Sequence, residues 1–473
     1  MADIPDALKY GASHSTIRTN RFRLVPQGTD SATPNGIFRV RLPEKSLVRL
    51  SSLSAYFTAQ LTGLVADTAG TTWNNALMPS SYKFFRSVRF YVGGAIASGG
   101  LCNNYDQVYQ QLVVASADKA WVESRFNEGY KELIGSTDDV SLPPVSLYAS
   151  PATANPAAPF TKQQYLTCSD FLGLPRCNGG GGVIDTSLYN SVEVEFVLND
   201  LSILSTAVGA TGSSAAVSFN LSQFRVDVDC VVSVSPMYVE MMAMRLQDAA
   251  PIRFPYQNYI STIAINTGSN RLQVNSQSLD MLALAPLGYG WNQLVNMTNN
   301  QMQPPRYKFD TKIGIVNNQD GSAAAQNSYV SQEGTITLQA VVGSDTYPRN
   351  PITHALIIPD LTINTLYHGS LNSKNLFSSG LNNAAQTFSR SYGLSDNFVW
   401  INNFSLESEG WATRKLTGID TSAQNIDLIV NSSGFGVGVG PQATTTGNFW
   451  LMTGLVTSQL IYDPATASVS IVA

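Results

Sequence analysis

The stretch Phe224–Asp248 constrains this fold more than any other, because a long strand there is followed at once by a short helix. Apolar residues occupy every second position of Phe224–Val234, which is the period of a strand with one buried face. Pro236 ends the strand, since proline cannot donate to a ladder. Met237–Gln247 holds good helix formers without glycine or proline, and a new strand-rich region follows Pro251. We therefore predict a seam between two similar β-rich halves.

Length and charge support a large protein with extensive contacts. A chain of 473 residues usually exceeds one hydrophobic core, so two or more domains are expected. Only 13% of the residues are charged, against roughly 25% in ordinary soluble domains. This composition suits a protein that hides much of its surface in close-packed contacts, and it also suits secreted β proteins and adhesins. The net charge of −5 argues against a general nucleic-acid binder.

The rest of the chain reads as short strands separated by Gly, Asn and Pro clusters, which indicates β-sandwiches or jelly rolls. Gly93-Gly94 suits a hairpin turn. Asn104–Val113 and Ala117–Phe126 predict short helices. The duplication is expected at the level of half-chains and is not legible residue by residue. The predicted strands are Ile37–Leu42, Leu47–Leu61, Phe84–Val92, Tyr189–Leu198, Ser261–Val274, Leu279–Leu284, Thr335–Val342, His354–Ile358, Asn397–Leu406, Ile426–Val430 and Phe449–Tyr462.

Candidate chemistry is sparse, and we predict no catalytic, cofactor-binding or metal site. The sequence has no HExxH, GxSxG or P-loop lysine pattern. None of the three histidines has a ligand-like partner nearby, and isolated cysteines are more often buried small hydrophobes than ligands. The glycine run Gly179–Gly182 lacks the lysine and helix start of a phosphate cradle and reads as a surface turn. The three histidines are His14, His354 and His368, and the four cysteines are Cys102, Cys168, Cys177 and Cys230.

Two carboxylate pairs, Glu193/Glu195 and Asp227/Asp229, each share a strand face. Paired carboxylates serve glycoside hydrolysis when they straddle the scissile bond. Neighbours on one strand face do not straddle a bond, so we interpret them as a solvated or subunit-facing edge that discourages wrong strand pairing. Glu407 and Glu409 near Trp411 resemble a carbohydrate-binding pairing, but such a cluster is more often a loop packed on its neighbour.

A basic N-terminal arm carries the better functional hypothesis. Residues 1–35 read as an arm or loop, and Arg18, Arg21 and Arg23 lie close together in a chain with few charges. These arginines would contact nucleic-acid phosphates or an anionic membrane surface, or the arm packs on a neighbouring subunit. Both interpretations stay open. The N-terminus lacks the apolar segment of a signal peptide, which favours synthesis in the host cytosol.

Three groups of residues resemble the double jelly-roll major capsid proteins of tailless icosahedral double-stranded DNA viruses, of the virophage and polinton-like type. The first is "FFRSVRFYVGG" at Phe84–Gly94 with the helix "NYDQVYQQL" that follows. The second is the seam "FRVDVDCVVSVSPMYVEMMAMRLQDAAPIRFPYQNY", Phe224–Tyr259. The third is Leu172–Leu198, where Leu174-Pro175 precedes a long strand. Residues 290–390 contain no such landmark.

The resemblance implies an all-β fold of two consecutive jelly-roll β-sandwiches with short helices in the connections. The expected domains are the arm 1–35, a first jelly roll 36–235, a helical connector 236–250 and a second jelly roll 251–473 with long loops around 290–390. It also implies a homotrimer whose six rolls form a pseudo-hexagon in a virion shell. Its partners would be neighbouring capsomers, penton and minor capsid proteins, and an internal membrane or the genome under the arm. No enzyme activity is implied.

Two other functions remain open. A β-rich receptor- or glycan-binding protein, such as a fibre head or adhesin, would carry a concave aromatic site, for example around Trp291 or Trp411. A glycoside-processing enzyme would lose turnover on carboxylate substitution. A capsid built from single jelly rolls is a variant of the first interpretation, and the chain length and the helical seam argue against it.

Overall fold

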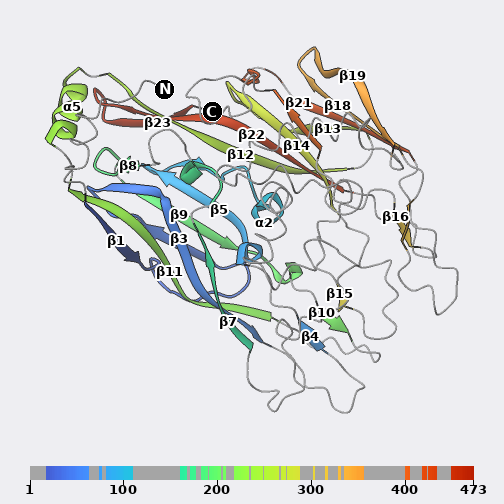
Figure 1. Ribbon diagram of the computed structural model, residues 1–473, viewed down its shortest axis with the longest axis horizontal. Helices are drawn as coiled ribbons and strands as arrows, with labels where there is room; N and C mark the ends of the chain where they lie inside the picture. The colour runs from blue at the N-terminus through green and yellow to red at the C-terminus, as the bar shows by residue number, and fades with distance from the viewer. Residues whose placement is uncertain are drawn as a thin grey trace, which may run out of the picture.

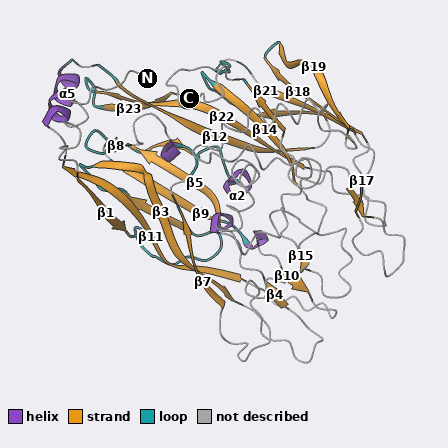
Figure 2. Cartoon of the chain, in the orientation of Figure 1, coloured by secondary structure: helices purple, strands orange, loops and turns teal. Residues whose placement is uncertain are grey.

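The computed structural model describes most of the strands of this chain. The described residues are 18–62, 74–76, 81–109, 160–167, 171–176, 183–189, 191–203, 206–208, 218–233, 236–248, 250–265, 268–272, 274–287, 302–303, 315–317, 329–331, 335–355, 400–404, 418–422, 424, 426–433 and 449–472. Almost all of them lie in antiparallel strands, with few helices among them (Figure 2). This confirms the predicted all-β class.

The first half is a sandwich of two sheets. One has the order β1-β11-β3-β7 with β8 beside β3, and the other has the order β2-β9-β5-β6. The predicted hairpin turn joins β5 to β6, and Gly93 and Gly94 both adopt positive φ angles, 58° and 85°. The strands are β1 Arg18–Leu24, β2 Ile37–Arg41, β3 Leu47–Thr62, β5 Phe85–Val92, β6 Ala95–Ser98, β7 Phe160–Leu166, β8 Val183–Asp185, β9 Val192–Leu198 and β11 Ser218–Ser233.

Aromatic rings from both sheets fill the space between them. Phe224 of β11 stacks on Phe38 of β2 with ring centroids 4.2 Å apart. Phe196 of β9 meets Phe224 edge-on at 5.0 Å, and Phe57 of β3 meets Phe85 of β5 at 5.5 Å. Rings offset or edge-on at these distances add to the stabilisation from burial. The sandwich therefore has a continuous aromatic core.

The seam has the structure that the alternation predicts. In β11 the alternating residues Phe224, Val226 and Val228 are buried. Helix α5, Pro236–Gln247, follows and leads to β12, which begins at Ile252. Pro236 is the first helical residue, where its missing N–H has no intrahelical partner to lose. Figure 1 shows α5 at one end of the molecule, linking the lower sandwich to the upper one.

The second half is also built of two sheets. Their orders are β12-β22-β14-β20, with β23 beside β22, and β13-β21-β18-β19. The strands are β12 Ile252–Ile265, β13 Gly268–Leu272, β14 Leu279–Leu287, β18 Thr335–Val342, β19 Asp345–Ala355, β20 Trp400–Asn403, β21 Ile426–Ser433, β22 Phe449–Asp463 and β23 Ser468–Val472. Short strands outside the two sandwiches are β4 Asn74–Ala76, β10 Thr206–Val208, β15 Met302–Gln303, β16 Ile315–Asn317 and β17 Tyr329–Ser331.

The two halves have the same strand order. Taken along the chain, β1, β2, β3, β5, β6, β7, β9 and β11 correspond one to one with β12, β13, β14, β18, β19, β20, β21 and β22. In the first half β11 lies between β1 and β3, and in the second half β22 lies between β12 and β14. The β18–β19 hairpin even turns at a positive-φ glycine, Gly343, as β5–β6 does at Gly93. The predicted duplication of two jelly rolls therefore holds at the level of topology.

One sequence prediction about the N-terminal arm needs correction. The composition of residues 1–35 predicts an arm or loop, but Arg18–Leu24 forms β1, which pairs with β11 from Arg18↔Ser233 to Leu24↔Val226. Its arginines make this segment look like a basic arm in sequence. Its partner strand, β11, lies at the C-terminal end of the first half, so the pairing is not visible locally. Within the range 290–390 the predicted strand Thr335–Val342 is confirmed as β18, and β19 follows it at Asp345–Ala355.

A further correction concerns the duplication, which is legible residue by residue at one corner. The tetrapeptide Ile-Asp-Thr-Ser occurs at Ile184–Ser187 and again at Ile419–Ser422. In the first copy the Thr186 hydroxyl accepts a hydrogen bond from the Ser46 amide (2.9 Å) and lies 2.9 Å from the Ser46 carbonyl oxygen. In the second copy Thr421 does the same with Ser276, at 3.3 and 3.1 Å.

Both copies of this corner fix the chain beside the start of a long strand, β3 or β14. Each threonine is buried, and the preceding aspartate accepts hydrogen bonds from the amide and hydroxyl of the following serine. Thr186→Val and Thr421→Val should each lower the free energy of unfolding by about 1–3 kcal/mol, because each removes the side-chain acceptor of a main-chain amide, that of the half-buried Ser46 or of the buried Ser276. Chemical denaturation checks this. The exposed serines give the controls: Ser187→Ala and Ser422→Ala should change it by about 0.5 kcal/mol or less, and a larger loss there would contradict this role for the threonines.

Candidate functional site

Four buried tyrosines join the two sandwiches. Tyr82 lies in the short 3-10 helix η1, Ser81–Phe84, and Tyr105 and Tyr109 lie in α2, Tyr105–Tyr109, within the predicted helix Asn104–Val113. Tyr259 comes from β12 of the second half. Ring centroids are 4.7 Å apart for Tyr82–Tyr109, 6.1 Å for Tyr105–Tyr109 and 6.5 Å for Tyr105–Tyr259. The chain of rings thus runs from the first sandwich into the second, and we call it the tyrosine cluster.

Hydrogen bonds from β12 to the first half accompany the rings. The Tyr256 hydroxyl donates to the Ala97 carbonyl oxygen and the Tyr259 hydroxyl to that of Val88. The Ser261 amide donates to the Leu101 carbonyl oxygen at 3.2 Å. Burial raises the pKa of both tyrosine hydroxyls well above the usual value, so both remain protonated donors at neutral pH. The first strand of the second half is therefore fastened to β5, β6 and the turn that follows.

Two glycines let the chain approach Tyr259 closely. Gly99 has φ +78°, and a Cβ there would lie 2.1 Å from the Val88 carbonyl oxygen and 3.3 Å from the Tyr259 hydroxyl. Gly173 has φ +86°, and a Cβ there would lie 2.8 Å from the Ser98 side chain and 3.3 Å from the Tyr259 ring. The two sandwiches therefore meet in one continuous hydrophobic core, which includes Met281, Leu451 and Leu455 of the second half.

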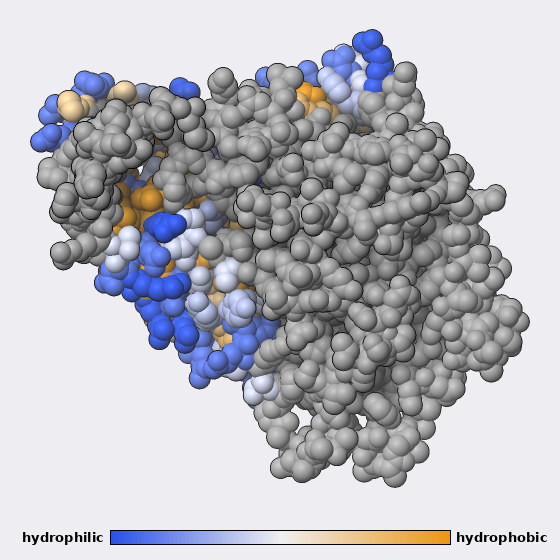
Figure 3. Space-filling view, in the orientation of Figure 1, coloured by the Kyte–Doolittle hydropathy of each residue, from blue (hydrophilic) through white to orange (hydrophobic). Residues whose placement is uncertain are grey.

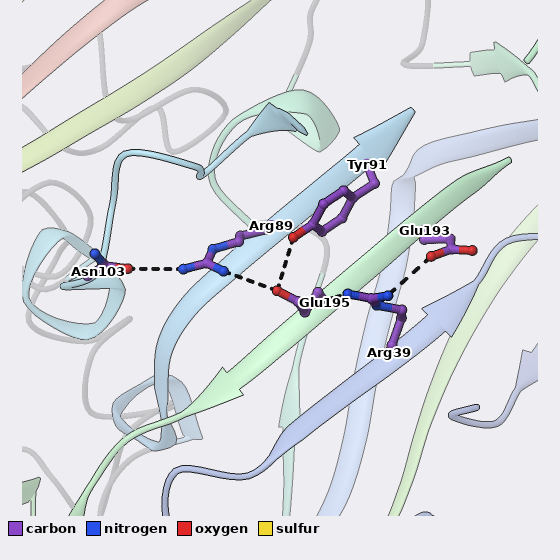
Figure 4. A network of polar contacts seen from close by, with 6 residues as sticks. All are labelled: Arg39, Arg89, Tyr91, Asn103, Glu193 and Glu195. Atoms are coloured by element: carbon purple, nitrogen blue, oxygen red, sulfur yellow. Dashed lines mark hydrogen bonds and ion pairs between the residues drawn. The ribbon is translucent and has the colours of Figure 1, made fainter. Parts of the chain in front are cut away.

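An ion-pair network lies on the outer face of the β2-β9-β5 sheet (Figure 4). The buried Glu195 carboxylate accepts hydrogen bonds from Arg39 (2.5 Å), Arg89 (3.2 Å) and the Tyr91 hydroxyl (3.2 Å). The hydrogen bond to Glu195 raises the pKa of the Arg39 guanidinium. Glu193 reaches the same Arg39 at 4.0 Å. The two glutamates thus share one cation across neighbouring strands. The predicted solvated edge is wrong for this pair, because β9 lies between β2 and β5 and Glu195 is buried against its arginine partners.

The predicted basic residues and the second carboxylate pair meet each other. Strand register places Arg21 opposite Asp229 and Arg23 opposite Asp227, with ion-pair distances of 3.8 and 3.5 Å. The Arg21 and Arg23 side chains remain 53% and 63% exposed, so their outer sides are open to a ligand. Arg18 lies opposite Ser233 in the same register. Figure 3 shows hydrophilic side chains gathered over this part of the first half.

Several predicted residues lie outside the described ranges. These are His14, His368, Cys168, Cys177, Trp291, Glu407, Glu409, Trp411, the run Gly179–Gly182 and the predicted helix Ala117–Phe126. Cys102 and Cys230 are free and buried, and burial raises the pKa of each thiol to about 11. Among the described residues, no cluster of His, Cys, Asp and Glu could hold a metal ion, and no helix is long and apolar enough to cross a membrane.

Comparison with known proteins finds similar folds among solved structures but no similar sequence. No protein-family model and no curated protein matches the sequence. Among solved structures, PBCV-1 VP54, fitted into a reconstruction of the virophage Sputnik, matches with a TM-score of 0.53 at 12% identity over 97% of both chains. The Faustovirus major capsid protein matches with a TM-score of 0.50 at 10% identity, over 94% of this chain and 90% of that one. The chain therefore has the double jelly-roll fold that the sequence resemblance predicted.

Proposed function

We propose that this chain is a major capsid protein that builds an icosahedral virus shell and resides in the virion. The observation that carries the proposal is the whole-length likeness to viral capsid structures, because it spans both rolls and their relative arrangement. The buried tyrosine cluster supports it, since a shell subunit must keep its two rolls in a fixed relation. The function is assembly, with no substrate turnover.

The proposed unit of assembly is a homotrimer whose six rolls stand in a ring and contact neighbouring capsomers, penton and minor capsid proteins. The low fraction of charged residues, 13%, supports extensive contacts between copies, because charged residues are depleted at interface centres. Arg18, Arg21 and Arg23 are proposed to face the inside of the shell, towards an internal membrane or the genome. Their pairing with Asp227 and Asp229 leaves little net charge there, so this contact should be weak and sensitive to salt.

Native mass spectrometry of the purified full chain tests the assembly. We expect a trimer at micromolar concentration, because the proposed lateral contacts must outlast the formation of a lattice. A monomer under these conditions, with intact β structure by circular dichroism, would contradict the proposal. Saturable binding of a glycan array by that monomer would favour the receptor-binding alternative instead.

A further inference from the structure

Three residues with complementary chemistry lie close together beside the tyrosine cluster. They are Lys83 of η1, Asp106 in the first turn of α2 and Asn199, which follows β9. Lys83 and Asn199 are 6% and 8% exposed, although lysine is almost never buried without a partner. The Asn199 side chain donates a hydrogen bond to the Asp106 carboxylate, and the Lys83 charge acts on the same carboxylate. The Asp106 carboxylate is therefore hydrogen-bonded to a primary amide and lies within the electrostatic reach of a buried amine.

The backbone holds these groups in place. The Asn199 side-chain amide also donates to the Lys83 carbonyl oxygen at 3.0 Å, and the Asn199 main-chain amide donates to the Phe84 carbonyl oxygen at 2.8 Å. Contact between the Tyr82 and Tyr109 rings packs η1 against α2. The amine, the amide and the carboxyl group thus sit on three elements fixed to one another, the condition under which an intramolecular reaction gains a high effective concentration.

The protonation of Asp106 suits proton transfer. Desolvation raises the pKa of its carboxyl group to about 7, while the Asn199 hydrogen bond and the Lys83 charge act in the opposite direction. A group that titrates near the working pH can both accept and release a proton. An ordinary ion pair at the surface requires only two opposite charges. It does not require that the lysine be buried or that an amide hydrogen-bond to the carboxylate.

We propose that Lys83 and Asn199 form an intramolecular isopeptide bond, with Asp106 carrying the proton. The Asp106 carboxylate takes a proton from the Lys83 ammonium, and the free Nζ attacks Cγ of Asn199. The Nζ–Cγ bond forms and the Cγ–Nδ2 bond breaks. Asp106 returns this proton to the departing nitrogen, which leaves as ammonia, and then takes up the second proton that Nζ loses as the amide forms. No oxidant, cofactor or other reactant is needed, and the reaction occurs once per chain.

The bond would tie η1 to the end of β9. These elements are far apart in sequence but adjacent in the first sandwich, where the tyrosine cluster begins. A covalent link there would restrict the unfolded chain, as a disulfide does, without depending on the redox state of the compartment. This inference concerns a modification within one chain, so it does not depend on the capsid function.

Mass spectrometry of the purified full chain tests the proposal. The intact mass should be lower than the sequence mass by one ammonia, and protease digestion should yield one branched peptide that joins Lys83 to Asn199. Lys83→Arg, which keeps the charge but removes the nucleophile, and Asp106→Asn should both restore the sequence mass. Asp200→Asn, a change at the exposed neighbouring carboxylate, should keep the cross-link. Circular dichroism verifies that each variant is folded.

Two results would overturn the proposal. One is a folded wild-type chain at the full sequence mass with both peptides linear. The other is loss of ammonia that persists in Lys83→Arg, because this would mean that a succinimide at Asn199-Asp200 accounts for the mass. A cross-link that forms equally well in Asp106→Asn would overturn the role of Asp106 as the proton carrier.

Discussion

Replacing Tyr259 by alanine is expected to lower the free energy of unfolding by about 3–5 kcal/mol, the cost of removing a large buried aromatic side chain. Tyr259 is 1% exposed and is the member of the tyrosine cluster that comes from the second half. Its ring lies against Tyr105 and the glycine turns at Gly99 and Gly173. The cavity would open where the two sandwiches meet, so the halves should unfold less cooperatively.

Urea denaturation followed by both tyrosine fluorescence and circular dichroism measures this effect. Tyr259→Phe separates the ring from the hydroxyl, whose hydrogen bond to the Val88 carbonyl oxygen is long at 3.4 Å, and it should cost about 1 kcal/mol or less. Tyr165→Ala is the matched control, because that ring is 46% exposed. If Tyr259→Ala were no more destabilising than Tyr165→Ala, the tyrosine cluster would not join the halves as described.

Gly99→Ala is expected to lower the free energy of unfolding by about 2–5 kcal/mol, from left-handed backbone strain of about 1–2 kcal/mol and an overlap worth about 1–3 kcal/mol. The new Cβ would lie 2.1 Å from the Val88 carbonyl oxygen, a backbone atom that cannot move without shifting β5. The turn that carries Gly99 also lies beside the Tyr259 hydroxyl. A shift of this turn would therefore spread to the contact between the halves.

Gly94→Ala isolates the overlap from the backbone strain. Gly94 has φ +85°, similar to the +78° of Gly99, but a Cβ there would meet nothing within 4 Å. Gly94→Ala should therefore cost only the conformational part, about 1–2 kcal/mol. The comparison is made by thermal denaturation of both variants under the same conditions. Equal destabilisation would mean that the close approach at Gly99 contributes nothing.

The strands were predictable from sequence where one face is buried and the other solvated. β2, β5, β9 and β11 alternate in sequence, and the structure buries the predicted apolar faces; Glu195 of β9 and Asp227 of β11, on the opposite faces, are buried as well. β1 was missed because its exposed face carries Arg21 and Arg23, whose partners Asp227 and Asp229 come from a strand at the far end of the same half. A cross-strand charge pair of this kind is visible in sequence only after the pairing is known.

The contact between the halves depends on residues far apart in the chain. The helix face with Tyr105 and Tyr109 could be read from its spacing, but its partner Tyr259 is separated from Val88, which it contacts, by 171 positions. Lys83 and Asn199 carried no local signal either, because neither residue type marks a buried position. The repeated Ile-Asp-Thr-Ser, in contrast, is readable by comparing the two halves directly, and it aligns them by sequence alone.

Cryo-electron microscopy of the purified full chain in solution tests the central claim most directly. We predict a ring of three copies, each contributing two upright jelly rolls, with the tyrosine cluster buried inside each copy. Density that shows single rolls turning independently about α5, or copies that associate without forming a closed ring of six rolls, would contradict this prediction.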